Sequence, residues 1–221
     1  MSFAGLKRSL IILLIAVLAL YINSALYTNA DTTKRIALTF DDGPHYKYTA
    51  EILDILKEHD VRATFFTVGS NAERFPQLIQ RELCEGHEVA NHTYSHKHMA
   101  RLTDEEFRTE VKSWESVMAE EHGYTSDLFR PPEGILTDSE SRIIEELGYD
   151  TVLWSIDTRD WAHNSVESIV DTVISNVKDG SVILFHDFVS GDSPTPKALR
   201  ALIPRLKEMG YELVSVSELQ K

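Results

Sequence analysis

Past residue 34 the chain alternates between short apolar runs and longer stretches in which apolar residues recur every three or four positions. The first pattern is typical of buried strands and the second of amphipathic helices. Strands are predicted at residues 35–40, 63–68, 88–90, 128–129, 151–156, 182–185 and 211–216. Helices are predicted at residues 49–59, 75–85, 103–122, 139–147, 166–177 and 197–209. A capping box at Thr103–Glu106 opens the third helix, and Pro204 is expected to kink or divide the last.

Strands that alternate with helices of these lengths pair in parallel through crossover helices. About seven such units fit between residues 31 and 221, and no internal linker or repeat interrupts them. One α/β domain is therefore predicted over residues 31–221. An open doubly wound sheet and a barrel both satisfy this pattern, and the number of strands does not decide between them.

The first 30 residues differ in character from the rest. Lys7 and Arg8 precede a run of 13 apolar residues, Leu10–Ile22. A helix that spans a bilayer usually needs about 20 apolar residues, so the run favours the apolar core of a secretory signal peptide. Cleavage is expected after Ala30, with a competing site after Ala25, and an uncleaved membrane anchor is the alternative. The domain is thus expected to be secreted or attached to the cell envelope, outside the cytoplasmic membrane.

Charge and cysteine content narrow the function classes. The 221-residue chain has 35 acidic and 22 basic residues, a formal net charge of -13. A nucleic-acid-binding domain is expected to be basic, and like-charge repulsion disfavours anionic polymers as partners. Cys84 is the only cysteine, so no intramolecular disulfide can form. Its helical spacing with neighbouring apolar residues predicts a buried apolar side chain rather than a nucleophile.

Polar residues that could take part in catalysis or metal binding cluster directly after the predicted strands. They are Asp41, Asp42, His92, Arg130, Asp157, Asp160, His186 and Asp187. In parallel α/β folds the carboxyl ends of the strands build the active site. The placement alone therefore predicts an active site of acids, histidines and an arginine.

His92 and His96 have the spacing of two metal ligands. If this segment is helical, positions i and i+4 share a face, and both imidazoles can reach one ion. The pair alone is weak evidence, because two surface histidines often have this spacing. A carboxylate from Asp41 or Asp42 would complete a two-histidine, one-carboxylate set, which is common in catalytic zinc sites and leaves a position open for water. The second carboxylate would then serve as a general base.

Two further segments complete the candidate site. Arg130-Pro131-Pro132-Glu133-Gly134 forms a stiff turn, since proline fixes φ and lacks an N–H; the Glu133 N–H is the next free donor. His186 follows a buried strand and becomes a credible general acid if a carboxylate holds its tautomer. Taken alone, the turn is equally compatible with a structural role, and a histidine at a strand end is more often a core residue whose hydrogen bonds are satisfied.

Together these segments resemble the polysaccharide deacetylase family, also called carbohydrate esterase family 4 or the NodB-homology domain. The matching segments are Thr39-Phe40-Asp41-Asp42-Gly43-Pro44, His92-Thr93-Tyr94-Ser95-His96, Arg130-Pro131-Pro132-Glu133-Gly134, Asp157-Thr158-Arg159-Asp160-Trp161 and Leu184-Phe185-His186-Asp187. They occur in the family's order and span most of residues 31–221. The resemblance implies a distorted (β/α) barrel of about seven parallel strands and a zinc-dependent hydrolase of carbon–nitrogen bonds other than peptide bonds.

The resemblance also implies a role for each matching residue. Asp42, His92 and His96 would bind Zn2+ or another divalent transition metal. Asp41 would be the general base, oriented by Arg130, and His186 the general acid, tuned by Asp160. The Glu133 N–H would bind the oxyanion, while Trp161 and Leu184 would wall the pocket for the acetyl methyl group. Where the family usually has an aromatic residue, this chain has Glu133, which puts the substrate preference in doubt.

The implied reaction is removal of N-acetyl groups from a cell-envelope polysaccharide, and its partner is that polysaccharide rather than nucleic acid. Peptidoglycan, a chitin-like oligomer and poly-N-acetylglucosamine are the candidate substrates, with peptidoglycan favoured by the leader. Three alternatives remain open at this point. They are a hydrolase of a small cyclic amide, an O-acetyl esterase and a catalytically silent carbohydrate-binding wall protein. Membrane contact is expected only through an uncleaved leader, and the oligomeric state is open.

Overall fold

The computed structural model describes residues 33–98 and 101–221. The expected leader lies outside the described residues, so its cleavage or anchoring stays a prediction. None of the helices in the described ranges is both long and apolar enough to span a bilayer.

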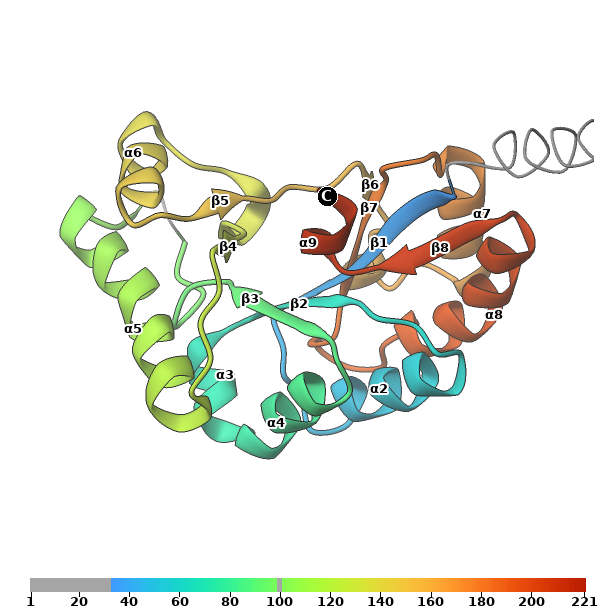
Figure 1. The fold of residues 1–221 in the computed structure, drawn as a ribbon, viewed down its shortest axis with the longest axis horizontal. Coiled ribbons are helices and arrows are strands. Elements are labelled where there is room, and N and C mark those ends of the chain that lie inside the picture. Colours follow the sequence, from blue (N-terminus) through green and yellow to red (C-terminus); the bar gives the residue numbers. More distant parts are fainter. Residues whose placement is uncertain (1–32, 99–100) are drawn as a thin grey trace, which may run out of the picture. The chain divides into compact units, whose positions relative to one another are not determined.

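One parallel sheet organises the residues from Lys34 onward (Figure 1). Its strands are β1 (Lys34–Asp41), β2 (Thr64–Thr67), β3 (Glu88–Asn91), β4 (Leu128–Phe129), β5 (Asp150–Thr151), β6 (Ile156–Asp157), β7 (Val182–His186) and β8 (Tyr211–Val214). Seven of them follow the order β5-β4-β3-β2-β1-β7-β6, and β8 pairs with the first half of β1. The predicted distorted barrel of about seven parallel strands is confirmed as a curled half-barrel.

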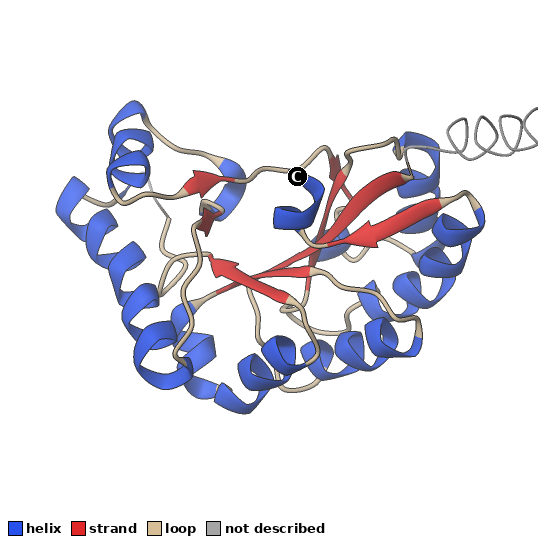
Figure 2. Ribbon diagram, viewed as in Figure 1, coloured by secondary structure: helices blue, strands red, loops and turns tan. Residues whose placement is uncertain are grey.

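The helices lie around the outer side of the sheet, except α9, which packs on its inner side (Figure 2). They are α2 (Tyr48–Glu58), α3 (Gly69–Arg74), α4 (Pro76–Cys84), α5 (Asp104–His122), α6 (Asp138–Glu146), α7 (Val166–Asn176), α8 (Thr195–Glu208) and α9 (Val216–Leu219). Two short 3-10 helices, η2 (Pro132–Gly134) and η3 (Asp160–Ala162), follow β4 and β6. The predicted capping box at Thr103 and Glu106 is present, and both of its reciprocal hydrogen bonds form.

Alternation along β1 separates two cores and positions the site. Its residues Ile36, Leu38 and Phe40 belong to the large outer core beneath α2, α7 and α8. Ala37 belongs to the inner core, which α9 closes with Val216. Successive side chains of a strand point to opposite faces. Thr39 and Asp41 therefore continue from Ala37 along the inner face toward the carboxyl end of the sheet.

The half-barrel is open between β5 and β6, the two strands at the ends of the sheet order. The single strand predicted at residues 151–156 is wrong, because this segment forms two separate strands. Val152 N–H still donates to Phe129 on the β4 side (2.9 Å), whereas Ser155 N–H donates to Val182 on the β7 side (2.9 Å). The residues between them cross the opening, and Figure 1 shows β5 and β6 on opposite sides of it. The apolar run over residues 151–156 predicts one strand, and nothing in its local pattern marks the change of partner from β4 to β7.

Three smaller features add to or differ from the predictions. Pro204 was expected to kink or divide its helix, and α8 runs undivided through it from Thr195 to Glu208. Two elements, α3 and α9, were not predicted. Cys84 is exposed at the end of α4, whereas Glu82 on the same helix is fully buried. The rotation of α4 thus places a carboxyl group, rather than the thiol, against the sheet.

Candidate active site

Side chains from the ends of five strands meet in one cleft of about 500 Å³ at the carboxyl edge of the sheet. The parallel register sets Asp41 of β1 directly beside His186 of β7. The cleft is lined by Asp41, Asp42, His92, His96, Glu133, Trp154, Asp157, Trp161, Leu184 and His186. Of the ten site residues predicted from the sequence, only Arg130 and Asp160 are absent from this lining, and both contact a residue that lines it.

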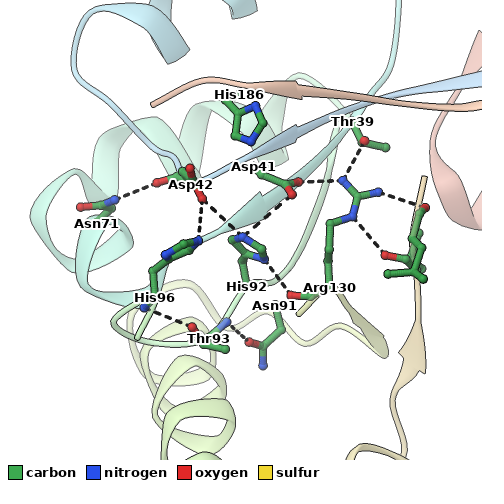
Figure 3. Close-up of polar contacts among 12 residues, drawn as sticks. Thr39, Asp41, Asp42, Asn71, Asn91, His92, Thr93, His96, Arg130 and His186 are labelled. Carbon is green, nitrogen blue, oxygen red and sulfur yellow. Dashed lines mark hydrogen bonds and ion pairs between the residues drawn. The ribbon is translucent and has the colours of Figure 1, made fainter. Parts of the chain in front are cut away.

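Asp42, His92 and His96 form the metal-binding geometry predicted for them. Asp42 Oδ1 lies 3.3 Å from His92 Nε2 and 3.1 Å from His96 Nε2. One candidate ligand atom from each residue lies within 4.8 Å of the other two. Asp42 reaches this position with φ of 76°, a left-handed conformation that Asp tolerates better than most residues. The Asn71 side chain donates to its carbonyl (2.8 Å) and holds the loop in place (Figure 3).

The hydrogen bonds of His92 test whether these residues suit a metal ion. His92 Nδ1 lies 2.7 Å from the Arg130 carbonyl oxygen. A carbonyl can only accept, so Nδ1 carries the hydrogen. When the ring is neutral, Nε2 therefore has a lone pair that faces the Asp42 carboxylate. Two hydrogen-bond acceptors, Nε2 and a carboxylate oxygen, then face each other without a hydrogen between them. Only a proton or a cation relieves that arrangement, and the Asp–His–His donor set with a fixed tautomer suits a divalent transition metal.

Charge at this cluster shifts the pKa of Asp42. Burial alone would raise the pKa of this carboxyl group, but hydrogen bonds and charge from His92 and His96 lower it well below its usual range. The pKa of His96 is raised, mainly by its hydrogen bond with Asp42, although burial opposes the shift. The lowered pKa of Asp42 favours the ionised carboxylate that a metal site needs, whereas a metal ion would have to displace the proton that the raised pKa of His96 favours.

The two histidines do not lie on a helix, contrary to the sequence-based assumption. His92 follows β3, and the chain then turns through left-handed conformations at Thr93 (φ 65°) and His96 (φ 51°). The Thr93 hydroxyl accepts from the His96 N–H (3.2 Å), and the Asn91 side chain accepts from the Thr93 N–H (2.8 Å). This loop therefore brings the two imidazoles together through its left-handed turns rather than through helical spacing.

Glu110 of α5 holds that loop, and sequence reasoning missed it. Its buried carboxylate accepts from the Ser95 N–H (2.7 Å), the Ser95 hydroxyl (2.7 Å) and Lys97 Nζ (2.9 Å). These contacts fix the segment between the two histidine ligands. Neighbouring Glu105 and Glu106 make Glu110 look like part of a solvated helix face, but its helical spacing with Phe107 and Trp114 is a signal that it points inward.

Asp41 pairs with a fully buried arginine. Arg130 Nη1 donates to Asp41 Oδ1 (2.7 Å) and to the Thr39 hydroxyl (2.8 Å). Its Nε donates to the Val152 carbonyl (3.0 Å), and its guanidinium lies 3.9 Å from the centre of the Phe66 ring. Burial lowers the pKa of Arg130, while the charge of Asp41 opposes the shift. The pair fixes the Asp41 carboxylate in the cleft, 3.9 Å from His92 Nε2.

His186 pairs with Asp160 on the opposite wall. Its Nδ1 donates to Asp160 Oδ1 (2.8 Å), and its backbone N–H donates to Asp160 Oδ2 (2.8 Å). The Thr195 hydroxyl also donates to Asp160 and was not predicted. Burial would lower the pKa of His186, but the hydrogen bond and charge of Asp160, together with Asp41 and Asp42, raise it to about 9. These contacts favour the protonated form of His186.

The predicted substrate-contacting residues wall the cleft. Leu184 is buried, and Trp161 is half exposed. Glu133 has φ of 61°, and its side chain lies 3.5 Å from His98 Nε2. Trp154 falls within the single strand predicted at residues 151–156. It instead lies on the crossing segment and lines the cleft, where Gly134 packs against its ring so closely that no Cβ would fit.

Comparison with known proteins agrees with this geometry. A family model described as polysaccharide deacetylase matches residues 28–152. The chain is 43% identical over 188 residues to a peptidoglycan-N-acetylglucosamine deacetylase of Bacillus cereus, covering 84% of this chain and 88% of that protein. It is 37% identical over 195 residues to a chitooligosaccharide deacetylase of Sinorhizobium fredii, covering 83% of this chain and 90% of that protein. The chain therefore belongs to the polysaccharide deacetylase family.

Solved structures show the same fold. A crystal structure of a peptidoglycan N-acetylglucosamine deacetylase superposes with a TM-score of 0.81 at 39% identity, over 84% of this chain and 87% of that chain. A pseudoenzyme of carbohydrate esterase family 4 from Bacillus anthracis superposes with a TM-score of 0.79 at 29% identity, over 86% of this chain and 66% of that chain. The fold thus occurs both with and without activity, so the argument for activity has to come from the site residues.

Substitution of Glu110 tests whether the ligand loop depends on it. Glu110→Ala removes three hydrogen-bond acceptor contacts, and we expect zinc affinity to fall about 10–100-fold, as is typical when partners that orient ligands are lost. Glu110→Gln should fall between Ala and the parent. Chelator competition measures the affinity. Glu120→Ala, the same change at an exposed position of α5, should leave it unchanged. An unaltered affinity in a folded Glu110→Ala variant would contradict the role given to Glu110.

Proposed function

We propose that this protein is an exported, zinc-dependent hydrolase that removes N-acetyl groups from N-acetylglucosamine units of peptidoglycan. The observation that carries this proposal is the combination, around one cleft, of a cluster of possible metal ligands, a carboxylate fixed by Arg130 and a histidine paired with Asp160. The relatives that act on peptidoglycan and chitooligosaccharides support the polymer class. Export rests on the leader pattern alone.

Amide hydrolysis requires a base, an acid and charge stabilisation, and the chain has a residue for each task. Held by Asp42, His92 and His96, a zinc ion supplies a Lewis acid and lowers the pKa of water to about 7. Asp41 accepts the proton of the attacking water, and Arg130 keeps its carboxylate oriented toward the cleft. The Glu133 N–H donates to the developing oxyanion, a contribution of about 3–4 kcal/mol for one such donor.

Departure of the amine requires a proton, which His186 donates. Asp160 holds its Nδ1–H, so Nε2 is the atom that gives up the proton to the sugar nitrogen. A positioned acid or base typically contributes about 10²–10⁴-fold in rate. Leu184 and Trp161 enclose the acetyl methyl group in apolar surface. A silent carbohydrate-binding protein would not need this complete set of acid, base and ligands.

Acetate release tests the proposal directly. We expect the protein to release acetate from peptidoglycan and from N-acetylglucosamine oligomers, to lose this activity after chelation, and to regain it when zinc is added. Metal content measured in parallel shows whether the ion returns to the site. Failure on both substrates, with zinc bound and the fold intact, would argue against the proposal. Better release from oligomers would instead assign the substrate to the chitin-like class.

Asp41→Asn separates the base from the metal site. The amide keeps the size of the side chain and can still accept from Arg130, but it cannot take a proton. We expect kcat to fall roughly 10²–10⁴-fold while zinc affinity stays close to that of the parent. His92→Ala, in contrast, should lose the metal as well. An active Asp41→Asn variant would show that another group acts as the base.

The pH profile should depend on Asp160. A group whose pKa is raised stays protonated up to that pKa, so His186 with a pKa of about 9 keeps the acid form at neutral pH. Asp160→Asn removes the largest contribution that raises this pKa, so the alkaline limb of kcat/KM against pH should move to lower pH. Asp157→Asn alters a cleft carboxylate that does not bond to His186 and should leave that limb in place. If Asp160→Asn leaves the alkaline limb at the same pH, His186 is not the general acid.

A further inference from the structure

Three exposed aromatic side chains follow three neighbouring strands at the edge that carries the site. Within the described residues they are the only aromatic residues among the exposed large apolar side chains: Tyr46 (66% exposed), Trp161 (49%) and Phe188 (37%). Trp161 follows β6, Phe188 follows β7 and Tyr46 follows β1, and these strands are consecutive in the sheet order. The three rings therefore succeed one another along the rim. Only Trp161 has a place in the site described above.

Tyr46 and Phe188 form one surface with His45, and we call these three residues the aromatic shelf. The His45 ring centre lies 4.6 Å from that of Tyr46 and 5.1 Å from that of Phe188, in tilted and edge-on geometries. Burial, and then the charge of Lys47, lower the pKa of His45. Its ring is therefore neutral at pH 7, and the shelf presents aromatic surface without a charge of its own.

Hydrogen bonds between two loops fix the shelf. The Tyr48 hydroxyl donates to the Gly191 carbonyl (2.6 Å), which ties the loop after β1 to the loop after β7. The Thr49 hydroxyl accepts from the His45 N–H (2.7 Å) and donates to the fully buried Asp187. Exposed rings on a rigid support lose little conformational entropy on binding, which is typical of a preorganised site.

The shelf lies beside the cleft. Phe188 is two residues from His186, which limits the separation of their Cα atoms to about 7 Å. His45 is three residues from Asp42, a limit of about 11 Å. The Asp187 carboxylate packs against Gly43 so closely that a Cβ there would not fit. The loop that carries Asp42 and the loop that carries Phe188 thus form one continuous floor.

We propose that the aromatic shelf binds a second sugar ring of the same polysaccharide chain, next to the unit that is deacetylated. This proposal rests on the proposed function. A pyranose ring has apolar C–H faces and polar edges, and aromatic side chains with polar tips, such as Tyr and His, match both. The row of rings along the rim suits an extended polymer, and the neutral shelf on a chain with a net charge of -13 suits an uncharged sugar.

A substrate-length series tests the shelf. The parent should have a lower KM for a hexamer of N-acetylglucosamine than for a dimer. In the double variant Tyr46→Ala/Phe188→Ala we expect this advantage to shrink about tenfold, equivalent to 1.4 kcal/mol, with little change in kcat. Tyr46→Phe/Phe188→Tyr keeps both rings and should retain the advantage. Met209→Ala, an exposed apolar side chain at the end of α8, is the matched control.

A binding measurement separates failure of the shelf from failure of the proposed function. In the Asp41→Asn background, calorimetry with the hexamer should show a dissociation constant about tenfold weaker when Tyr46 and Phe188 are alanine. If the double variant changes neither binding nor the length dependence, the shelf proposal is wrong while the deacetylase function stands. Equal losses for dimer and hexamer would also overturn it, because they would indicate distortion of the catalytic loops. If the parent background does not bind the hexamer, the shelf has no sugar ligand.

Discussion

The Arg130 guanidinium is the interaction on which the interior of the half-barrel depends. It is fully buried, and it joins β1 through Thr39 and Asp41 to the crossing segment through the carbonyls of Val152 and Leu153. Removing one partner of a buried ion pair typically costs about 3–5 kcal/mol, because the other charge is left uncompensated. The same contact therefore stabilises the open side of the sheet and sets the orientation of Asp41. Stability and chemistry are coupled at this point.

Each buried acid around the cleft is matched by its own partner. Asp41 pairs with Arg130, Asp42 with the two histidines, and Asp160 with His186. Asp187 has only the Thr49 hydroxyl as a side-chain partner, and burial raises its pKa to about 7. Low-dielectric surroundings strengthen each of these interactions. Neighbouring carboxylates in the same cleft can therefore have different roles in proton transfer, as acid–base chemistry at neutral pH requires.

The sequence predicted most of the site because the polar residues follow regular elements. A buried strand ends at Asp41 and another at His186, and parallel pairing necessarily brings such ends together. What could not be predicted depends on contacts that are distant in sequence. Ser95, which lies between the left-handed turns at Thr93 and His96, is held by Glu110, 15 residues further on. The division of residues 151–156 likewise depends on two different neighbouring strands, and no local pattern encodes that choice.

The resemblance to a family pseudoenzyme shows how fold and chemistry can separate. That relative keeps the fold with a TM-score of 0.79, so the scaffold does not require catalysis. In this chain the large outer core packs the sheet against α2, α7 and α8 and contains none of the proposed catalytic residues or metal ligands. Loss of His186 or a metal ligand would leave that core intact. Loss of Arg130, in contrast, would also destabilise the fold, because Asp41 and the Val152 carbonyl on the inner face would lose their partner. Selection for folding alone can therefore retain Arg130, whereas selection for chemistry adds a separate reason to retain the ligands and His186.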